Sequence, residues 1–193
     1  MRSQVTTGRG DNGLTVALNG HEYPKSHPIM ECVGTLDELR NHIAIARVMM
    51  ENTPELKETE LNDTLKWLLH VFFAIGTDCS DPLLEKPAFH KVRINSTHLE
   101  RLETEQYRLE AEVNLPRQFI IGASNRLAAQ LDIACSVARR FERNLVRLKE
   151  HFPEFQADHL FAFTNRLSDF LYIAARWLDK GTYQTVDYDL IRT

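Results

Sequence analysis

The sequence lacks several features that would place it in a special class of protein. Its apolar runs fall short of the roughly 18 residues that a membrane-spanning helix needs. It has three cysteines, widely separated and without a Cys-x-x-Cys pair, which disfavours a zinc or iron–sulfur site. The odd cysteine number and the absence of an apolar segment at the start are typical of a cytoplasmic protein with reduced thiols. We therefore expect a cytoplasmic protein with no dedicated metal site.

The sequence also lacks a large excess of positive or negative charge. The chain has 23 basic and 27 acidic residues, and its net charge of −4 gives no general attraction to nucleic acid or to an anionic membrane. The eight histidines are scattered, with none at helical metal-ligand spacing, so we expect ordinary surface or core residues. A length of 193 residues, 43% of them apolar, is typical of a single globular domain.

What the sequence does contain is helical periodicity. Apolar residues recur every three or four positions in five segments, at about 35–50, 56–78, 96–113, 124–150 and 156–179. Short connections and no convincing strand pair predict an all-α fold, an antiparallel, ferritin-like up-and-down bundle of five helices. We expect one domain over residues 1–193, made of an irregular arm of loop or short strand at 1–33, the bundle at 34–180 and a short, irregular tail at 181–193.

Local signals place the starts of two of these helices. Thr35 is followed three residues later by Glu38, which predicts a capping box at the start of the first helix. Ser96 or Thr97 would cap the third helix. On the fourth helix the apolar stripe faces the core, and its members are Leu127, Leu131, Ala134, Ala138 and Phe141.

The arm contains a glycine-rich segment, Thr7–Thr15, with the sequence Thr-Gly-Arg-Gly-Asp-Asn-Gly-Leu-Thr. Glycine lets the backbone adopt positive φ and approach a ligand closely. Successive free backbone N–H groups can then form a concavity that binds phosphate. Such a segment alone is weak support, because most glycine-rich segments are turns.

Two further clusters lie on predicted helices. Arg139, Arg140 and Arg143 place three guanidinium groups within two turns of the fourth helix, and guanidinium matches phosphate oxygens in a bidentate way. The alternative is a solvated basic face paired with nearby acids. A polar line on the fifth helix, made of Asn165, Asp169 and Tyr172, indicates either a polar seam at an interface or a structural hydrogen-bond network.

These clusters, in this order, resemble the PduO-type ATP:cob(I)alamin adenosyltransferases over residues 7–179. The family's phosphate loop, Thr-x-x-Gly-Asp-x-Gly-x-Thr, is matched by Thr7, Gly10, Asp11, Gly13 and Thr15. A following lysine is matched by Lys25, and Glu-x-x-Gly-Thr-x-Asp-Glu-Leu by Glu31, Gly34, Thr35, Asp37, Glu38 and Leu39. The family's Arg-Arg-x-Glu-Arg is matched by Arg139, Arg140, Glu142 and Arg143, and its Asn-Arg-Leu-Ser-Asp by residues 165–169.

The resemblance implies a five-helix bundle that assembles as a homotrimer with active sites between subunits. It implies transfer of the 5′-deoxyadenosyl group of ATP to the cobalt of cob(I)alamin, giving adenosylcobalamin and triphosphate, with Mg²⁺ held by the ATP phosphates. Cob(I)alamin is a strong nucleophile, so positioning and charge stabilisation would supply the rate. A reductase or an acceptor enzyme would be a further partner.

By the same resemblance, the loop and Lys25 would wrap the triphosphate, while Arg139 would neutralise phosphate charge. Glu142 and Asn165 would orient the nucleotide. Phe119 aligns with a phenylalanine that helps exclude the lower axial ligand of cobalt. The residues with implied catalytic roles are therefore Arg139, Asp37 and Phe119. Those with implied binding roles are Thr7, Gly10, Asp11, Gly13, Thr15, Lys25, Arg139, Glu142 and Asn165.

The sequence departs from the family pattern at several of these places. Cys135 stands where the family has an arginine that pairs, across the subunit interface, with the aspartate matched by Asp37. Glu22 reverses the charge of an arginine that follows the phosphate loop, and Asp132 replaces a histidine. A Pro-Gly-Gly turn before the fourth helix reads Gly-Ala-Ser at 122–124.

The loss of that arginine leaves two expectations for Asp37, because an unpaired buried carboxylate is costly. Either Asp37 is exposed, or another cation, Arg126 or Arg47, replaces the missing one. The substitution Cys135→Arg would then restore a salt bridge to Asp37. Three functions stay open: an adenosyltransferase of a divergent subgroup, a non-catalytic nucleotide- or corrinoid-binding carrier or regulator, and a purely structural helical oligomer.

Overall fold

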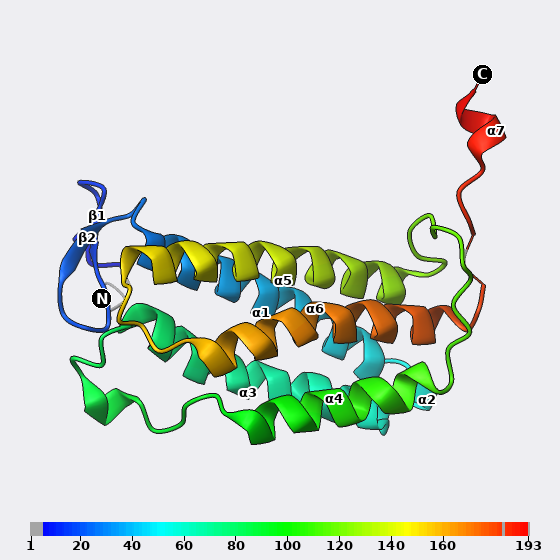
Figure 1. Cartoon of the computed structure of the whole chain (residues 1–193), viewed down its shortest axis with the longest axis horizontal. Helices are drawn as coiled ribbons and strands as arrows, with labels where there is room; N and C mark the ends of the chain where they lie inside the picture. Colours follow the sequence, from blue (N-terminus) through cyan, green and yellow to red (C-terminus); the bar gives the residue numbers. More distant parts are fainter. Residues whose placement is uncertain (1–5, 183, 193) are drawn as a thin grey trace.

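A computed structural model describes residues 6–182 and 184–192 and shows a helical bundle (Figure 1). The two short strands are β1 (Leu14–Val16) and β2 (Glu22–Pro24). The long helices are α1 (Pro28–Glu51), α3 (Glu60–Ser80), α4 (Ser96–Glu110), α5 (Arg126–His151) and α6 (Asp158–Asp179). Two single-turn helices, α2 (Pro54–Lys57) and α7 (Tyr188–Ile191), and a 3₁₀ turn at Pro87–Phe89 complete the described elements. The predicted all-α bundle of five long helices is confirmed.

The five long helices form a closed ring around one core. Helix α1 packs against α3 and α5, α5 packs against α6, and α4 packs against α6 and, through fewer contacts, against α3. Successive long helices run in opposite directions (Figure 1). Because an odd number of alternating helices cannot close a ring without one exception, α4 and α6 are neighbours that run the same way.

The core is apolar along the whole bundle. All five residues of the stripe predicted for α5, Leu127, Leu131, Ala134, Ala138 and Phe141, are buried. They meet fully buried rings on other helices, such as Phe72 and Phe163. Among the described helices, none is both long and apolar enough to cross a membrane.

The start of the first helix was predicted too late in the chain. Helix α1 begins at Pro28, and His27 caps it by accepting a hydrogen bond from the Ile29 N–H at 3.2 Å. Proline suits the first helical position because its φ is already helical. Thr35 is therefore no cap: it lies inside α1 and donates to the Glu31 carbonyl at 2.8 Å. The predicted boundary between residues 33 and 34 falls within this helix.

Two later helix starts lie close to their predicted positions, but their caps are asparagines. The Asn95 side chain accepts from the N–H groups of Thr97 and His98, so neither Ser96 nor Thr97 is the cap of α4. The Asn125 side chain accepts from Ala128 N at the start of α5. Asparagine is among the strongest N-cap residues, so these starts could have been predicted.

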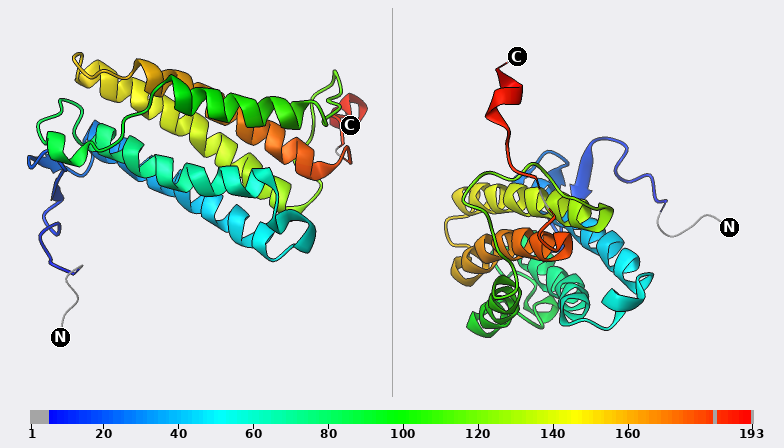
Figure 2. Two further views of the ribbon diagram at one scale, coloured as in Figure 1. Left: turned by 90° about the horizontal axis from the view of Figure 1, so that it is seen from below. Right: turned by 90° about the vertical axis from the view of Figure 1, so that its right-hand side faces the viewer.

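The N-terminal arm contains short strands, as one of the two predictions for it allowed, but their pairing was not predicted. Strands β1 and β2 pair antiparallel, with Thr15 opposite Tyr23. The reversal between them uses Gly20 at a φ of 90°. This hairpin lies at the end of the bundle where α1 begins and α5 ends (Figures 1 and 2).

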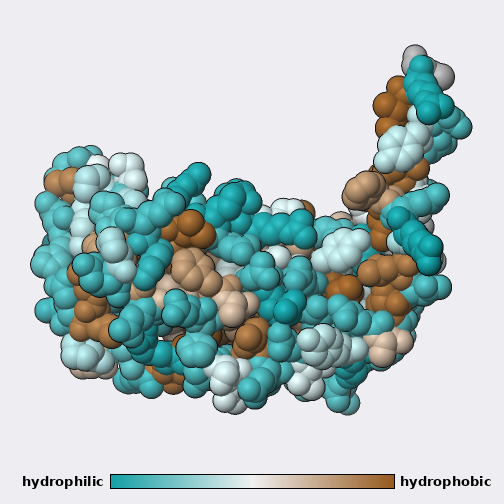
Figure 3. Space-filling view, in the orientation of Figure 1, coloured by the Kyte–Doolittle hydropathy of each residue, from teal (hydrophilic) through white to brown (hydrophobic). Residues whose placement is uncertain are grey.

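The C-terminal tail was predicted to be irregular, and this was wrong in part. Ile120 and Thr185 form an antiparallel bridge, so the tail pairs with the connection between α4 and α5. The tail then leaves the bundle and ends in α7 (Figure 1). Apolar side chains are visible on this projecting segment (Figure 3), and Tyr188 is 59% exposed.

Candidate functional site

The glycine-rich segment folds into tight turns that leave backbone donors free. The Asp11 N–H donates to the Gly8 carbonyl and the Gly13 N–H donates to the Gly10 carbonyl, both at 3.2 Å. Gly8 and Gly13 have φ of 70° and 82°, which glycine adopts without strain. Within the described residues, the N–H groups of Gly10 and Asn12 have no acceptor. The loop therefore presents the unused donors that bind an anion.

Lys25 lies against this loop because the hairpin returns the chain to it. Its N–H donates to the Gly13 carbonyl at 2.9 Å. A Cβ at Gly10 would lie 3.0 Å from Lys25 Nζ, so the end of the lysine side chain lies against the backbone of the loop at Gly10. No carboxylate among the described residues pairs with this exposed ammonium. The sequence prediction that Lys25 joins the loop agrees with this placement.

The other members of the loop motif lie close by. Thr7 Oγ1 accepts from the Arg9 N–H at 3.4 Å, and Asn12 Oδ1 accepts from the Leu14 N–H at 3.1 Å. Thr15 lies on β1, half-buried, and Glu22 lies on β2 with an exposed side chain. The negative charge of Glu22 is therefore near the loop in sequence and exposed to water, where its effect on a bound anion is screened.

The three arginines of α5 differ in what they bind. Arg140 forms an ion pair with Glu38 of α1. Arg143 donates to the backbone carbonyl of Arg139 at 3.1 Å. The Arg139 side chain is exposed, and its guanidinium has no partner among residues 6–182 and 184–192. Of the three, Arg139 is therefore the one available to an external anion.

Glu142 and Asn165 meet beside Arg139. Asn165 Nδ2 donates to Glu142 Oε1 at 3.3 Å, joining α6 to α5. Arg139 and Glu142 are three residues apart on α5, so their side chains share one face. Further along the predicted polar line of α6, Asp169 and Tyr172 are half-buried, and Asp169 pairs with Arg166 at 3.1 Å. This patch combines a free cation, a carboxylate and an amide on one surface.

Asp37 has a partner that the sequence analysis missed. It is exposed and pairs with Arg40, three residues later on α1, at 3.0 Å. Within this chain neither predicted replacement pairs with Asp37, because Arg47 bonds to Glu51 and Asn62 and the ion pair of Asp37 is with Arg40; a pairing of Arg47 or Arg126 with Asp37 of another copy stays a prediction. The first expectation, an exposed Asp37, is confirmed. The i,i+3 spacing of Asp37 and Arg40 was the signal that could have identified this pair.

Cys135 is buried within the chain. Its Sγ donates to the Ser168 carbonyl of α6 at 3.2 Å, and burial raises the pKa of the thiol. Cys135 thus faces α6, whereas Asp37 is exposed on α1. A salt bridge from Cys135→Arg to Asp37 of the same chain does not fit this placement, and one between copies stays a prediction.

A buried ion network lies near the start of α5, and the sequence analysis did not find it. Arg176 of α6, 2% exposed, pairs with Asp132 at 2.6 Å and with Asp179 at 3.1 Å. Asp179 accepts in turn from the N–H and the Oγ of Ser124, at 2.8 and 2.6 Å. Burial raises the pKa of Asp132, and the hydrogen bond from Arg176 opposes that shift. Asp132, which departs from the family's histidine, thus belongs to a structural network in this chain.

Phe119 lies in the connection between α4 and α5, and its side chain is 77% exposed. This connection is at the end of the bundle opposite to the hairpin (Figures 1 and 2). Helix α5 has 26 residues and so spans roughly 39 Å between the two ends.

The predicted site residues therefore fall in three places within one chain. The loop and Lys25 lie at the hairpin end, Phe119 lies at the far end, and Arg139 lies between them. Arg139 is about 18 Å along α5 from His151, which contacts His27 beside the hairpin. A single chain brings Arg139, Glu142 and Asn165 together but keeps them apart from the loop.

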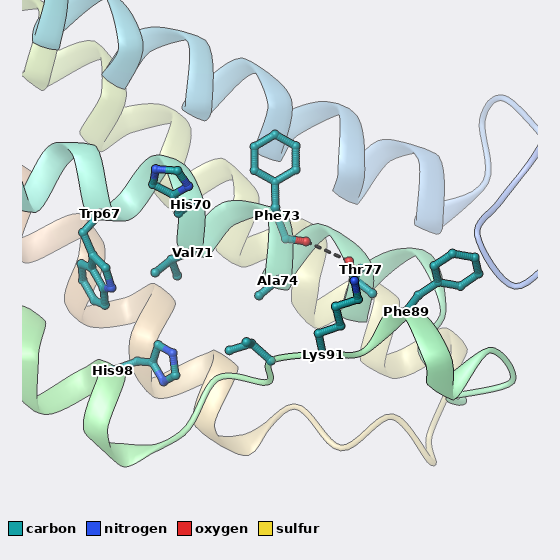
Figure 4. A pocket seen from close by; sticks show the side chains of 10 residues that line it. Trp67, His70, Val71, Phe73, Ala74, Thr77, Phe89, Lys91 and His98 are labelled. Atoms are coloured by element: carbon teal, nitrogen blue, oxygen red, sulfur yellow. Dashed lines mark hydrogen bonds between the residues drawn. The ribbon is translucent and has the colours of Figure 1, made fainter.

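An apolar groove lies elsewhere in the described part of the chain (Figure 4). It has a volume of about 380 Å³ and lies between α3, the 81–95 connection and the start of α4. Trp67 stacks on His98 at one end, with ring centroids 6.3 Å apart, and Lys91 reaches across it. None of the predicted site residues lines this groove.

Comparisons with known proteins agree with the motif pattern. The family model for cobalamin adenosyltransferase matches residues 5–178. The corrinoid adenosyltransferase PduO of Citrobacter freundii is 32% identical over 181 residues, which are 93% of this chain and 51% of that protein. The chain thus spans about half the length of that relative. The corrinoid adenosyltransferase of Mycobacterium leprae is 28% identical over 93% of both chains.

Solved structures agree on the fold. A variant of the PduO-type ATP:corrinoid adenosyltransferase from Lactobacillus reuteri, complexed with cobalamin and ATP, matches with a TM-score of 0.81. It is 24% identical, and the match covers 96% of this chain and 99% of that chain. A second variant of that enzyme, complexed with ATP, matches with a TM-score of 0.78 and 24% identity over 94% and 98% of the two chains. Since the family model covers nearly the whole chain, the protein belongs to the cobalamin adenosyltransferase family.

Proposed function

We propose that this protein transfers the 5′-deoxyadenosyl group of ATP to the cobalt of cob(I)alamin, giving adenosylcobalamin and triphosphate. The observation that supports it most is the placement of Lys25. Its unpaired ammonium lies against Gly10 in a loop whose backbone N–H groups at Gly10 and Asn12 are unused. A cation and free amide donors on one concave loop suit a polyphosphate.

This reaction requires the protein to align the two substrates and to stabilise negative charge. The electron pair of cob(I)alamin forms the cobalt–carbon bond at C5′ of ATP, and the C5′–oxygen bond breaks with its electron pair leaving on triphosphate. Cobalt is thereby oxidised from the +1 to the formal +3 state, so no side-chain nucleophile is required. The protein must stabilise the negative charge on the departing triphosphate, which preorganised cations and N–H donors do well.

Lys25 and Arg139 are the cations that we assign to this charge, with Mg²⁺ held by the phosphates. Both are exposed and without an ion-pair partner in the described chain, so a ligand does not have to displace a carboxylate. Glu142 and Asn165, joined by their hydrogen bond, would orient the nucleotide beside Arg139.

Phe119 is assigned to the corrinoid. An exposed ring on a loop has little contact within its own chain, and at 77% exposure most of its apolar surface is available to a ligand. Placed against the lower face of the corrin, it would exclude the lower axial ligand of cobalt. That exclusion eases the reduction to cob(I) because the electron pair of the axial ligand no longer raises the energy of the cobalt orbital.

We further propose that the working site forms between copies of the chain, in a homotrimer. The loop and Phe119 lie at opposite ends of a bundle whose longest helix spans roughly 39 Å. ATP and the corrinoid must nevertheless touch during the reaction. The loop of one copy would therefore meet Arg139 and Phe119 of a neighbour.

The test is anaerobic. Purified protein, MgATP and chemically reduced cob(I)alamin are mixed, and the absorbance is followed for conversion to adenosylcobalamin. Turnover supports the proposal and shows that Cys135 and Glu22 are tolerated. Binding of ATP without turnover would contradict it and favour a non-catalytic nucleotide- or corrinoid-binding carrier or regulator. Light scattering at the assay concentration tests the trimer separately.

A further inference from the structure

The backbone that holds Phe119 is paired with the C-terminal segment. Ile120 and Thr185 face each other in an antiparallel bridge. The bonds on either side of it run from the Ile121 N–H to the Gln184 carbonyl at 2.8 Å and from the Val186 N–H to the Phe119 carbonyl at 2.9 Å. Phe119 therefore has its own carbonyl fixed by a residue 67 positions later in the chain.

The chain reaches this pairing through a sharp reversal after α6. Lys180 and Gly181 have φ of 50° and 74°, so the helix ends in two left-handed residues. The Thr182 hydroxyl donates to Ser124 Oγ at 2.9 Å. Ser124 is also held by Asp179 of α6. The Phe119 segment is thus fastened at residues 119–121 and again three residues later at Ser124.

This fastened backbone contrasts with the exposure of the ring. The side chain of Phe119 is 77% exposed, although the backbone carbonyl of the same residue accepts a hydrogen bond from Val186. A connection as long as residues 111–125 would otherwise sample many conformations, and a ligand would have to order it on binding. Pairing with residues 184–186 removes that requirement before the ligand arrives.

We propose that residues 184–186 are a positioning element for Phe119, with the backbone N–H of Val186 as the donor on which its alignment depends. This rests on the proposed function, in which Phe119 occupies the lower face of the corrinoid. Val186 does not touch the substrate and acts through Phe119. The C-terminal segment therefore belongs to the corrinoid half of the site.

The test removes the Val186 N–H donor and is designed to keep the helical bundle intact. Val186→Pro eliminates the N–H that bonds to the Phe119 carbonyl, and the residue before it, Thr185, lies in an antiparallel bridge, a pairing of extended chain, which a following proline favours. Val186→Ala is the matched control, because it shortens the side chain and keeps the N–H. Circular dichroism and the melting temperature check that both variants retain the bundle.

The main readout is the cobalt spectrum. Cob(II)alamin bound with MgATP and without its lower ligand is four-coordinate, and its absorption and electron paramagnetic resonance spectra differ from those of the five-coordinate form. We expect Val186→Pro to lower the four-coordinate fraction at least threefold and kcat about tenfold, with KM for ATP within twofold of the wild type. Val186→Ala should match the wild type. Wild-type spectra in Val186→Pro would overturn the proposal.

A double-mutant cycle tests whether Val186 acts through Phe119. If it does, Val186→Pro should add nothing to Phe119→Ala, because the two changes remove one interaction. Additive losses would overturn the proposal.

Hydrogen exchange tests the same claim without any corrinoid. The Ile121 amide, which is bonded to Gln184, should exchange at least tenfold faster in Val186→Pro than in Val186→Ala. Equal rates would overturn the positioning claim. If instead the wild type forms no four-coordinate cob(II)alamin and no product, the proposed function fails, and the exchange rates still decide whether the segment is held.

Discussion

The two ends of the bundle prepare for ligands in different ways. At the hairpin end the structure is local: tight turns of the loop, and a lysine whose charge is left uncompensated. At the far end it is long-range: Asp132, Arg176 and Asp179 form a buried network that fastens Ser124. The hairpin end leaves the positive charge of Lys25 unpaired. The far end holds its backbone in place while the ring of Phe119 stays exposed. A polyphosphate needs the first arrangement and a flat macrocycle needs the second.

The largest effect on stability is expected from removing the buried ion network at the far end. Arg176→Ala leaves Asp132 and Asp179 with their negative charges largely unpaired in the interior. We expect the free energy of unfolding to fall by about 3–5 kcal/mol, measured by urea denaturation. Arg166→Ala on the same helix is the control, since its pairs with Glu103 and Asp169 are partly exposed. A loss below about 1 kcal/mol is expected there; equal losses would refute the distinction.

The next effect concerns the free cation at the middle of α5. Arg139→Ala should weaken ATP binding by about 1.5–3 kcal/mol, because a charge-assisted contact to phosphate is lost. Titration calorimetry measures it. Arg140→Ala is the control, since its guanidinium is already paired with Glu38. Wild-type affinity in Arg139→Ala would remove this residue from the site.

A smaller effect is a loss of folding stability at the hairpin end as the pH falls, and it depends on His27. Burial and the nearby His151 lower the pKa of His27 below 6.5, so the folded chain binds fewer protons there than the unfolded chain. The contribution of neutral His27 to the free energy of unfolding is therefore complete above pH 6.5. It is lost as the pH falls through the lowered pKa. Protonation also removes the acceptor that caps α1.

Urea midpoints at pH 7.5 and 5.5 measure this dependence. His151→Gln should reduce the difference between the two pH values, because His27 no longer faces a second imidazole at 3.2 Å. The exposed His70→Gln is the control and should leave the difference unchanged. A larger difference in His151→Gln would contradict the assignment.

The smallest effect is a difference in thiol reactivity between the ends. Cys32 and Cys79 are fully buried at the hairpin end, with their sulfurs 3.6 Å apart, and hydrogen bonding and burial raise the pKa of Cys79 well above its usual value. Cys135 is 5% exposed. A thiol reagent at pH 8 should therefore modify Cys135 first and Cys79 last, and all three at once in denaturant. Mass spectrometry of the labelled chain would expose the reverse order.

Much of the fold could be predicted because it depends on periodicity. The buried stripe of α5 follows from apolar residues at three- and four-residue spacing, and five such segments specify a bundle. The start of α1 was missed because Gly34 and Thr35 look like a boundary, whereas Pro28 and His27 supply the true one. Gly34 is exposed inside α1 with open space at its Cβ position, and the roughly 1 kcal/mol that a helical glycine costs does not end a helix of 24 residues, so the residue type alone misleads.

The candidate site was predictable in its parts but not in its arrangement. The loop motif, the free Arg139 and the exposed Phe119 can be found by type and order. The alternating order of the helices places the arm and the Phe119 connection at opposite ends, but motif order does not show which helices become neighbours or which charged side chains stay unpaired. The network around Arg176 was missed for a related reason: Asp132 and Arg176 are 44 residues apart, and no local spacing links them.

The odd number of helices has a practical consequence for anyone who fuses another protein to this chain. An alternating series of five must finish at the end opposite to where it began, so the two termini emerge at opposite ends (Figure 1). A partner joined beyond the described C-terminal segment would be delivered at the end of the bundle that carries Phe119, and one joined before residue 6 would be delivered at the end that carries the glycine loop. The choice of terminus thus decides which end of the bundle the added protein crowds.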